Sequence, residues 1–157
     1  MPASKMSLED SVVELTLESD LSNVEVAEEV ARRIATTAGF GEEDQHRIDL
    51  AVHETVINAI AHGNKSDPHK QVRLRFQIHS DRLEIRIRDQ GSGFDPRRVA
   101  DPLADQNVLR VSGRGVFLTR TFMDDYRVET PPGGGTEVIL VKRLNSNNSV
   151  PPRRKEP

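Results

Sequence analysis

The chain has 157 residues, which is the size of one domain, and a net charge of −3. It contains no cysteine, which excludes disulfides and thiolate metal sites. The charges are mixed and aromatic residues are scarce (five Phe, one Tyr and no Trp), which argues against nucleic-acid binding. There is no apolar run long enough to span a membrane and no secretory signal at the N-terminus, so we expect a cytoplasmic protein.

The first half of the chain predicts one strand and two helices. Residues 1–10 are expected to be flexible, and the alternation of apolar and polar residues over 13–17 indicates a strand. A capping-box pattern predicts a helix that begins at 22–25 and ends at the glycines of 39–41. A second helix is expected from about 42 to 61, because acidic residues suit its N-terminal end.

The second half of the chain predicts mostly strands. Residues 72–78 and 83–87 alternate as a β-hairpin, and a glycine-bearing loop follows at Asp89. After a long loop over 95–112, we expect a short helix over 113–123, strands over 126–129 and 136–141, and a disordered tail over 144–157. Residues 11–143 are thus predicted to form one α+β domain, a two-layer sandwich with a mixed, mostly antiparallel sheet and helices on one face.

A polar stripe interrupts the apolar character of the second helix. Glu54, Asn58 and His62 follow one another at intervals of four residues and so fall within a stripe roughly 80° wide at about 100° per residue. Each has an ordinary explanation: an ion pair for Glu54, a bond to a neighbouring backbone for Asn58, and the helix C-terminal dipole for His62. The alternative is that the stripe faces a ligand.

Glycines and one acid gather at the ends of the predicted elements. Gly113 and Gly115 open the short helix, where free backbone N–H groups attract anions, although such a pair is also typical of an ordinary turn. Strand parity puts Asp89 on the same side as the apolar residues 83, 85 and 87. A carboxylate there needs a partner, so Asp89 either caps the loop, forms an internal salt bridge or accepts a hydrogen bond from a ligand.

Four motifs in order resemble the ATP-site boxes of the Bergerat fold, which histidine-kinase catalytic domains and gyrases share. They are Glu54-x-x-x-Asn58-Ala59-x-x-His62-Gly63, Asp89-Gln90-Gly91-Ser92-Gly93-Phe94, Gly113-Arg114-Gly115-Val116 and Gly135-Thr136. The phrase "GRGVFLTRTFMDDYRVE" is typical of the small bacterial anti-sigma-factor serine/threonine kinases, which the chain resembles over about residues 10–143.

The resemblance implies a role for each matching position. Glu54 would be the general base of phosphoryl transfer, and Asn58 would hold Mg²⁺ against the phosphates of ATP. Asp89 would accept a hydrogen bond from the adenine amino group, and residues 95–112 would form a lid over the phosphates. The other implied nucleotide-binding residues are Gly91, Gly93, Phe94, Gly113, Arg114, Gly115, Val116 and Thr136.

The resemblance also implies partners. A free-standing domain of this kind phosphorylates an anti-anti-sigma protein of the STAS type on Ser or Thr and holds a sigma factor away from RNA polymerase, commonly as a homodimer. The alternative is a binding module of the same fold that holds its partner without catalysis, with ATP as a structural ligand or absent.

Overall fold

The computed structural model describes residues 10–92 and 115–144, in which five strands form one sheet. The strand order is β1-β2-β3-β5-β4, and every pairing is antiparallel, so the expected mixture of parallel and antiparallel strands is replaced by a purely antiparallel sheet. The strands are β1 (Ser11–Glu18), β2 (Gln71–Ile78), β3 (Arg82–Arg88), β4 (Asp125–Glu129) and β5 (Glu137–Arg143).

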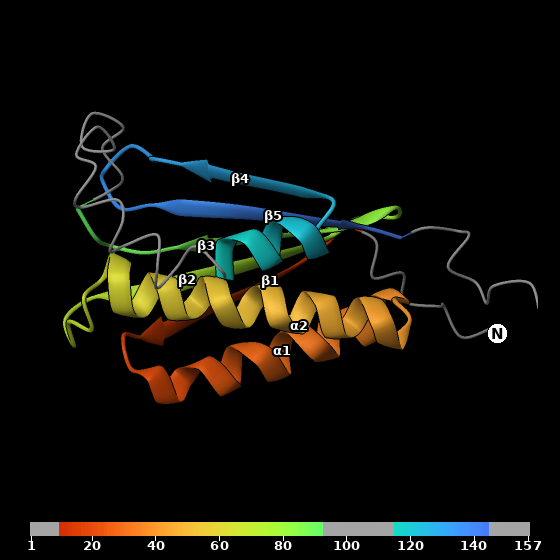
Figure 1. Cartoon of the computed structure of the whole chain (residues 1–157), viewed down its shortest axis with the longest axis horizontal. Coiled ribbons are helices and arrows are strands. Elements are labelled where there is room, and N and C mark those ends of the chain that lie inside the picture. Colours follow the sequence, from red (N-terminus) through yellow and green to blue (C-terminus); the bar gives the residue numbers. More distant parts are fainter. Residues whose placement is uncertain (1–9, 93–114, 145–157) are drawn as a thin grey trace, which may run out of the picture.

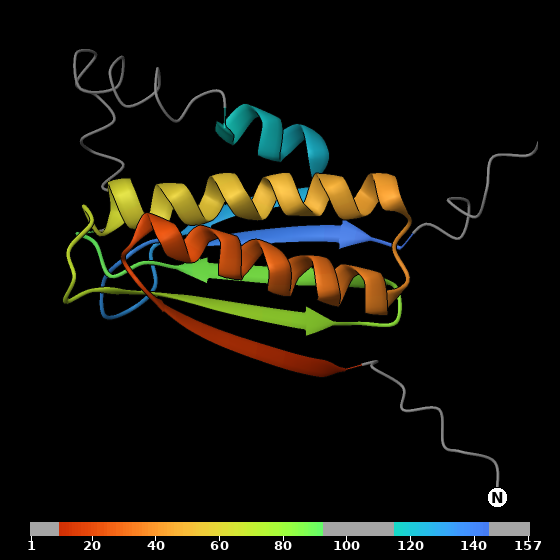
Figure 2. The same ribbon diagram turned by 90° about the horizontal axis from the view of Figure 1, so that it is seen from below.

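The helices cover one face of this sheet, as predicted (Figure 1, Figure 2). They are α1 (Val24–Ala38), α2 (Glu42–Ile57), the π-helix η2 (Asn58–Gly63) that continues α2, and a helix over 115–122. A single 3-10 turn, η1 (Leu21–Asn23), precedes α1. No described helix is long and apolar enough to cross a membrane.

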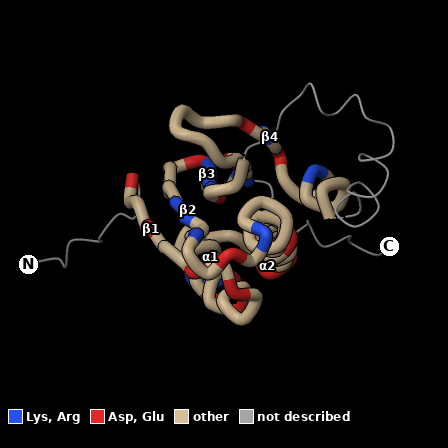
Figure 3. Tube along the Cα trace, turned by 90° about the vertical axis from the view of Figure 1, so that its left-hand side faces the viewer, with Lys and Arg blue, Asp and Glu red and all other residues tan. Residues whose placement is uncertain are grey.

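The core lies between the helices and the sheet. Every second residue of β2 and β3 is buried, which places residues 72, 74, 76 and 78 and residues 83, 85 and 87 against the helices. Ala27, Ala31 and Ala35 of α1 are fully buried, since small side chains allow the helix to approach the sheet closely. Figure 3, seen along the strands, shows α1 and α2 stacked together under one side of the sheet.

The start of α1 differs from the predicted capping box. The carboxylate of Asp20 accepts hydrogen bonds from the backbone N–H of Ser22 at 2.9 Å and from its hydroxyl at 2.8 Å. Asp20 therefore caps the 3-10 turn, and α1 begins at Val24, within the predicted range but without a side-chain cap of its own. Its end at Gly39 was predicted correctly: this residue has φ 96, a left-handed conformation that glycine adopts without strain.

The end of the second helix also differs from the prediction. The α-helix stops at Ile57, and residues 58–63 form a wider π turn, in which the backbone N–H of Asn64 donates to the carbonyl of Ala59 at 2.8 Å. The π turn places the residue after it, Asn64, in a fully buried position. Insertions of this kind recur at functional sites, because they redirect the side chains around them.

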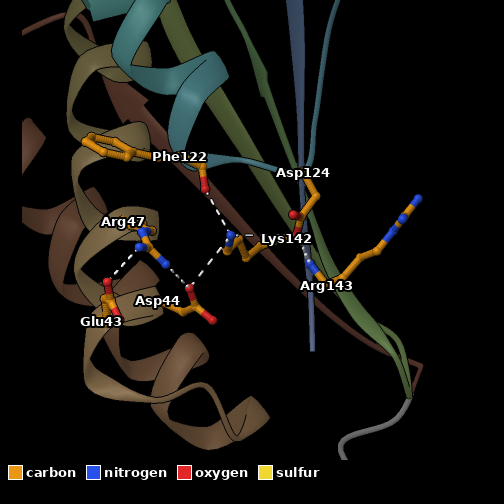
Figure 4. Close-up of polar contacts among 7 residues, drawn as sticks. All are labelled: Glu43, Asp44, Arg47, Phe122, Asp124, Lys142 and Arg143. Carbon is orange, nitrogen blue, oxygen red and sulfur yellow. Dashed lines mark hydrogen bonds and ion pairs between the residues drawn. The ribbon is translucent and has the colours of Figure 1, made fainter. Parts of the chain in front are cut away.

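A buried lysine joins the helix over 115–122 to the rest of the molecule (Figure 4). The Lys142 ammonium donates to the carbonyl of Phe122 at 3.0 Å, and carboxylate oxygens of Asp44 and Asp124 each lie 3.7 Å from it. Asp44 also pairs with Arg47 at 2.9 Å. A cation at the C-terminal end of one helix and an acid in the first turn of α2 both complement the helix dipoles, so this cluster ties the two helices and β5 together.

Candidate functional site

Asp89 lies at the end of β3 on the side of the sheet that carries the helices, as strand parity predicts. It is 7% exposed, and its Oδ1 accepts hydrogen bonds from the backbone N–H groups of Gly91 at 2.9 Å and Thr136 at 3.0 Å. Its own N–H donates to the carbonyl of Thr136 at 3.0 Å. Its other oxygen, Oδ2, receives no hydrogen bond from a described residue, so one edge of a fixed carboxylate stays available.

Three glycines crowd around this carboxylate. A Cβ at Gly63 would overlap the Asp89 side chain, and a Cβ at Gly135 would overlap the Asp89 carbonyl. A Cβ at Gly91 would overlap the backbone carbonyl of Gly63. Glycine is therefore required at all three positions for η2, the loop after β3 and the turn before β5 to meet at one point.

Glu54 of α2 and Gly115 form a second contact, on the N-terminal side of η2. A Cβ at Gly115 would overlap the Glu54 carboxylate, so the start of the helix over 115–122 lies directly against this acid. The hydroxyl of Thr119 donates to the carbonyl of Gly115 at 2.7 Å within the same helix. The structure thus brings together two predicted site residues that are far apart in the sequence.

Asn58 begins the π turn between these two contacts. Within the described part of the chain, the side chains of Glu54 and Asn58 make no hydrogen bond or ion pair, and both are partly exposed. Neither ordinary explanation, a salt bridge for Glu54 or a backbone bond for Asn58, is found among the described residues. His62 is exposed near the end of the turn.

The remaining predicted site residues fall into two groups. Thr136 meets Asp89 through its backbone, and Val116 is partly buried in the first turn of the helix over 115–122. The others, together with the lid over 95–112, lie outside the described residues: Gly93, Phe94, Gly113 and Arg114.

One residue of the site has no counterpart in the sequence analysis. Asn64 is fully buried, and its Oδ1 accepts a hydrogen bond at 2.7 Å from the backbone N–H of Gln90, the neighbour of Asp89. Its Nδ2 donates to the hydroxyl of Ser19 at 2.8 Å and to the carbonyl of Gln71 at 3.0 Å. The available signal was its place directly after the motif ending in Gly63, where the periodic pattern of the helix has already ended.

A pocket of about 220 Å³ adjoins the loop after β3, and Asp89, Gln90 and Gly91 form part of its lining. Arg73 and Arg88 line it, and both alternate with core residues, so they point away from the helices. Arg88 donates to the carbonyls of Pro132 at 3.2 Å and Gly134 at 3.3 Å, which holds the glycine turn in place. Asp89 and Gly135 thus belong both to this pocket and to the contacts described above, whereas Glu54 does not line it.

The sheet, the helical layer and the two glycine-lined contacts define the class of protein. A family model described as "Histidine kinase-like ATPase domain" matches residues 17–142, and the chain belongs to this family.

The chain is also similar in sequence to several named bacterial proteins. The chain is 31% identical over 121 residues to the serine-protein kinase RsbW of Listeria innocua, an alignment that covers 71% of this chain and 74% of that protein. It is 35% identical over 105 residues to the anti-sigma F factor of Oceanobacillus iheyensis, covering 66% of this chain and 72% of the relative. With RsbW of Bacillus subtilis the identity is 30% over 124 residues, an alignment that covers 71% of this chain and 72% of that protein.

A solved structure has the same fold. The crystal structure of the RsbU and RsbW domains of a Mycobacterium tuberculosis protein superposes with a TM-score of 0.62 at 18% sequence identity. The match covers 85% of this chain and 32% of the other. The fold predicted from the four motifs is therefore confirmed.

Proposed function

We propose that this chain is an ATP-dependent protein serine/threonine kinase that also acts as an anti-sigma factor. The observation that carries the proposal is the arrangement of two acids: Asp89 after β3 is a fixed carboxylate with one free edge, and Glu54 of α2 is an uncommitted acid against the start of a helix. The names of the relatives, serine-protein kinase and anti-sigma F factor, support the same conclusion.

Asp89 would recognise the base of the nucleotide. The backbone N–H groups of Gly91 and Thr136 hold Oδ1, which leaves Oδ2 to accept a hydrogen bond from an amino group on a flat heterocycle. A base with an amino group at this position satisfies the carboxylate, whereas a base with a carbonyl oxygen there repels it. This chemistry favours adenine over a purine with an oxygen at the same position.

Glu54 would act at the phosphate end of the site. A carboxylate oxygen of Glu54 would take the proton from the serine or threonine hydroxyl that attacks, a contribution of about 10²–10⁴-fold to the rate. Gly115 has no side chain, so the backbone N–H groups at the start of its helix approach the reacting phosphate without obstruction.

The residues present fit a nucleotide with a divalent cation. Asn58 offers an uncommitted amide oxygen, and the described residues contain no group of three or more acids and histidines that could hold a metal alone. A Mg²⁺ ion would thus be held by Asn58 together with phosphate oxygens and waters, which is the usual arrangement for this ion. When bound, Mg²⁺ neutralises charge on the phosphates.

The proposed partners follow from the relatives and the resemblance. The phosphate acceptor would be an anti-anti-sigma protein of the STAS type, the protein held would be a sigma factor, and the kinase would be a cytoplasmic homodimer. Neither partner is a nucleic acid, in agreement with the net charge of −3.

The test is transfer of the γ-phosphate to a STAS-type partner by wild type, Glu54→Gln and Asn58→Ala. Wild type should transfer, Glu54→Gln should bind nucleotide and sigma factor but not transfer, and Asn58→Ala should lose the Mg²⁺-dependent part of nucleotide binding. Saturation with ATP and Mg²⁺ at about 100 times the Kd should add roughly 2.7 kcal/mol to the free energy of unfolding. Nucleotide and sigma binding without transfer in wild type would instead establish the non-catalytic binding module.

A further inference from the structure

Asn64 is the centre of a buried hydrogen-bond network that joins four segments of the chain. Its side chain bonds to Ser19 after β1, to Gln71 at the start of β2 and to Gln90 after β3, while Asn64 itself ends η2. The Ser19 hydroxyl in turn donates to the carbonyl of Lys70 at 2.6 Å. With 0% exposure, Asn64 has every polar atom of its amide engaged inside the protein.

The loop that carries Asp89 is held by this network at two points. The backbone N–H of Gln90 donates to Asn64 Oδ1 at 2.7 Å, and the Gln90 side chain accepts a hydrogen bond from the backbone N–H of Gln71, also at 2.7 Å. Gln90 stands between Asp89 and Gly91, whose N–H holds the carboxylate. The two bonds therefore restrain the residue on which the direction of the Asp89 side chain depends.

Asn64 is also joined directly to the helical side of the site. It follows Gly63, whose backbone lies against the Asp89 carboxylate and the backbone of Gly91. The π turn that ends at Gly63 begins at Asn58. A single buried side chain thus sets the distance between the loop that carries Asp89 and the turn that carries Asn58.

We propose that Asn64 is a positioning residue for base recognition, which places Asp89 so that the site prefers ATP to nucleotides without the 6-amino group. The inference rests on the proposed function, because it assumes that Asp89 meets the base. Loss of the bond to Gln90 would let the loop relax, which weakens the hydrogen bond that only adenine makes. Binding energy from the phosphates, at the Glu54 end, would be retained.

The test compares the dissociation constants of ATP and ITP, since hypoxanthine carries an oxygen where adenine carries the amino group. We expect Asn64→Ala to reduce the preference for ATP by about tenfold, the value of one ordinary hydrogen bond. Ser19→Ala is the matched control: it removes another buried partner of Asn64 and lowers the melting temperature, but leaves the bond to Gln90 and hence the preference unchanged.

A second pair of variants covers the case in which Asn64→Ala does not fold. Gln90 is exposed, so Gln90→Ala should fold while losing the bond to Gln71, and it should reduce the preference in the same direction. Gln90→Glu keeps an oxygen acceptor for the Gln71 N–H and should retain the wild-type preference for ATP. Equal ATP preference in wild type, Asn64→Ala and Gln90→Ala would overturn the inference.

A different result, obtained with Asp89→Asn, would reject the proposed role of Asp89 in base recognition. If Asp89→Asn binds ATP and ITP in the wild-type ratio, Asp89 does not read the base, and both the recognition role and the inference are wrong. If Asp89→Asn loses the preference while the Asn64 and Gln90 variants keep it, the proposed function stands and only the positioning role is rejected.

Discussion

The Asp89 carboxylate lies against the backbone of Gly63 so closely that no side chain fits at residue 63. One residue ends a strand and the other ends the π turn, so this contact fixes the sheet and the helical layer against each other at the candidate site. Because Asp89 is short and bonded to two backbone N–H groups, it has little freedom to move away.

Gly63→Ala should therefore damage both stability and nucleotide binding. We expect the free energy of unfolding to fall by about 1–3 kcal/mol, as for other overpacked sites, and the stabilisation by ATP to disappear. Gly41→Ala is the control, since its φ is −71 and nothing lies within 4 Å of the added carbon. Thermal unfolding with and without ATP measures both effects; retention of the ATP-dependent shift in Gly63→Ala would contradict the prediction.

Gly115→Ala should separate catalysis from stability. The added methyl group meets the flexible end of Glu54, which can rotate away, so the free energy of unfolding should change by less than about 1 kcal/mol. Displacement of the proposed base should lower phosphoryl transfer by roughly 10²-fold. Single-turnover transfer assays alongside nucleotide titration check this, with Glu54→Gln as the reference for complete loss of the base. Unchanged transfer would show that Glu54 acts from another position.

Lys142→Met should loosen the helix over 115–122 at its C-terminal end. The variant leaves the Phe122 carbonyl without its donor, while Asp44 keeps Arg47 as a partner. We expect the free energy of unfolding, measured with urea, to fall by about 1–3 kcal/mol. This is less than the loss expected when one member of a buried ion pair is removed and the other has no second partner. Arg143→Met is the control, because the bond from Arg143 to Asp124 comes from the backbone N–H and survives the change. Equal losses in both variants would argue against the proposed anchor.

Asp49 gives the protein a pH dependence opposite to that of an acid whose pKa is lowered on folding. Burial raises the pKa of Asp49 above its usual value of 3.8, with Arg32 acting against the shift. The folded state then binds this proton more tightly than the unfolded state, so stability falls as the pH rises from 3.8 through the folded-state pKa. Asp49 also has a buried oxygen, Oδ1, that finds no hydrogen-bond partner among the residues that the structure describes.

Asp49→Asn should therefore be more stable than wild type at neutral pH, and the difference should vanish below pH 3.8. Urea unfolding across this range is the measurement. Asp20→Ala should show the opposite pH dependence. The bonds from Ser22 lower the pKa of Asp20, so the stability that Asp20 contributes is present at neutral pH and disappears as the pH falls through its folded-state pKa. A pH-independent gain in Asp49→Asn would reject the explanation.

Local patterns predicted most of the fold. Alternation located β2 and β3, Gly39 marked the end of α1, and parity placed Asp89 on the side of the helices, because each depends on a few neighbouring residues. The motifs also singled out Glu54 and Gly115 as site residues, and the structure brings these two residues into contact.

Features that depend on distant contacts were not predicted. The π turn and the burial of Asn64 require Ser19, Gln71 and Gln90 to converge, and no short stretch of sequence encodes that convergence. The cap at Asp20 was missed for a local reason. The residues from Ser22 to Glu25 resemble a capping box, but the Ser22 hydroxyl donates to Asp20 instead of accepting from the helix backbone.

The strand order also has a kinetic consequence. β1 must find β2 across the segment between Glu18 and Gln71, and β3 must find β5 across a similarly long segment between Arg88 and Glu137. Closing so long a loop is slow, since its entropy is lost before the contacts form. The bonds between Asp89 and Thr136 form only when β3 pairs with β5, so refolding chains should regain nucleotide binding with that pairing and not before it.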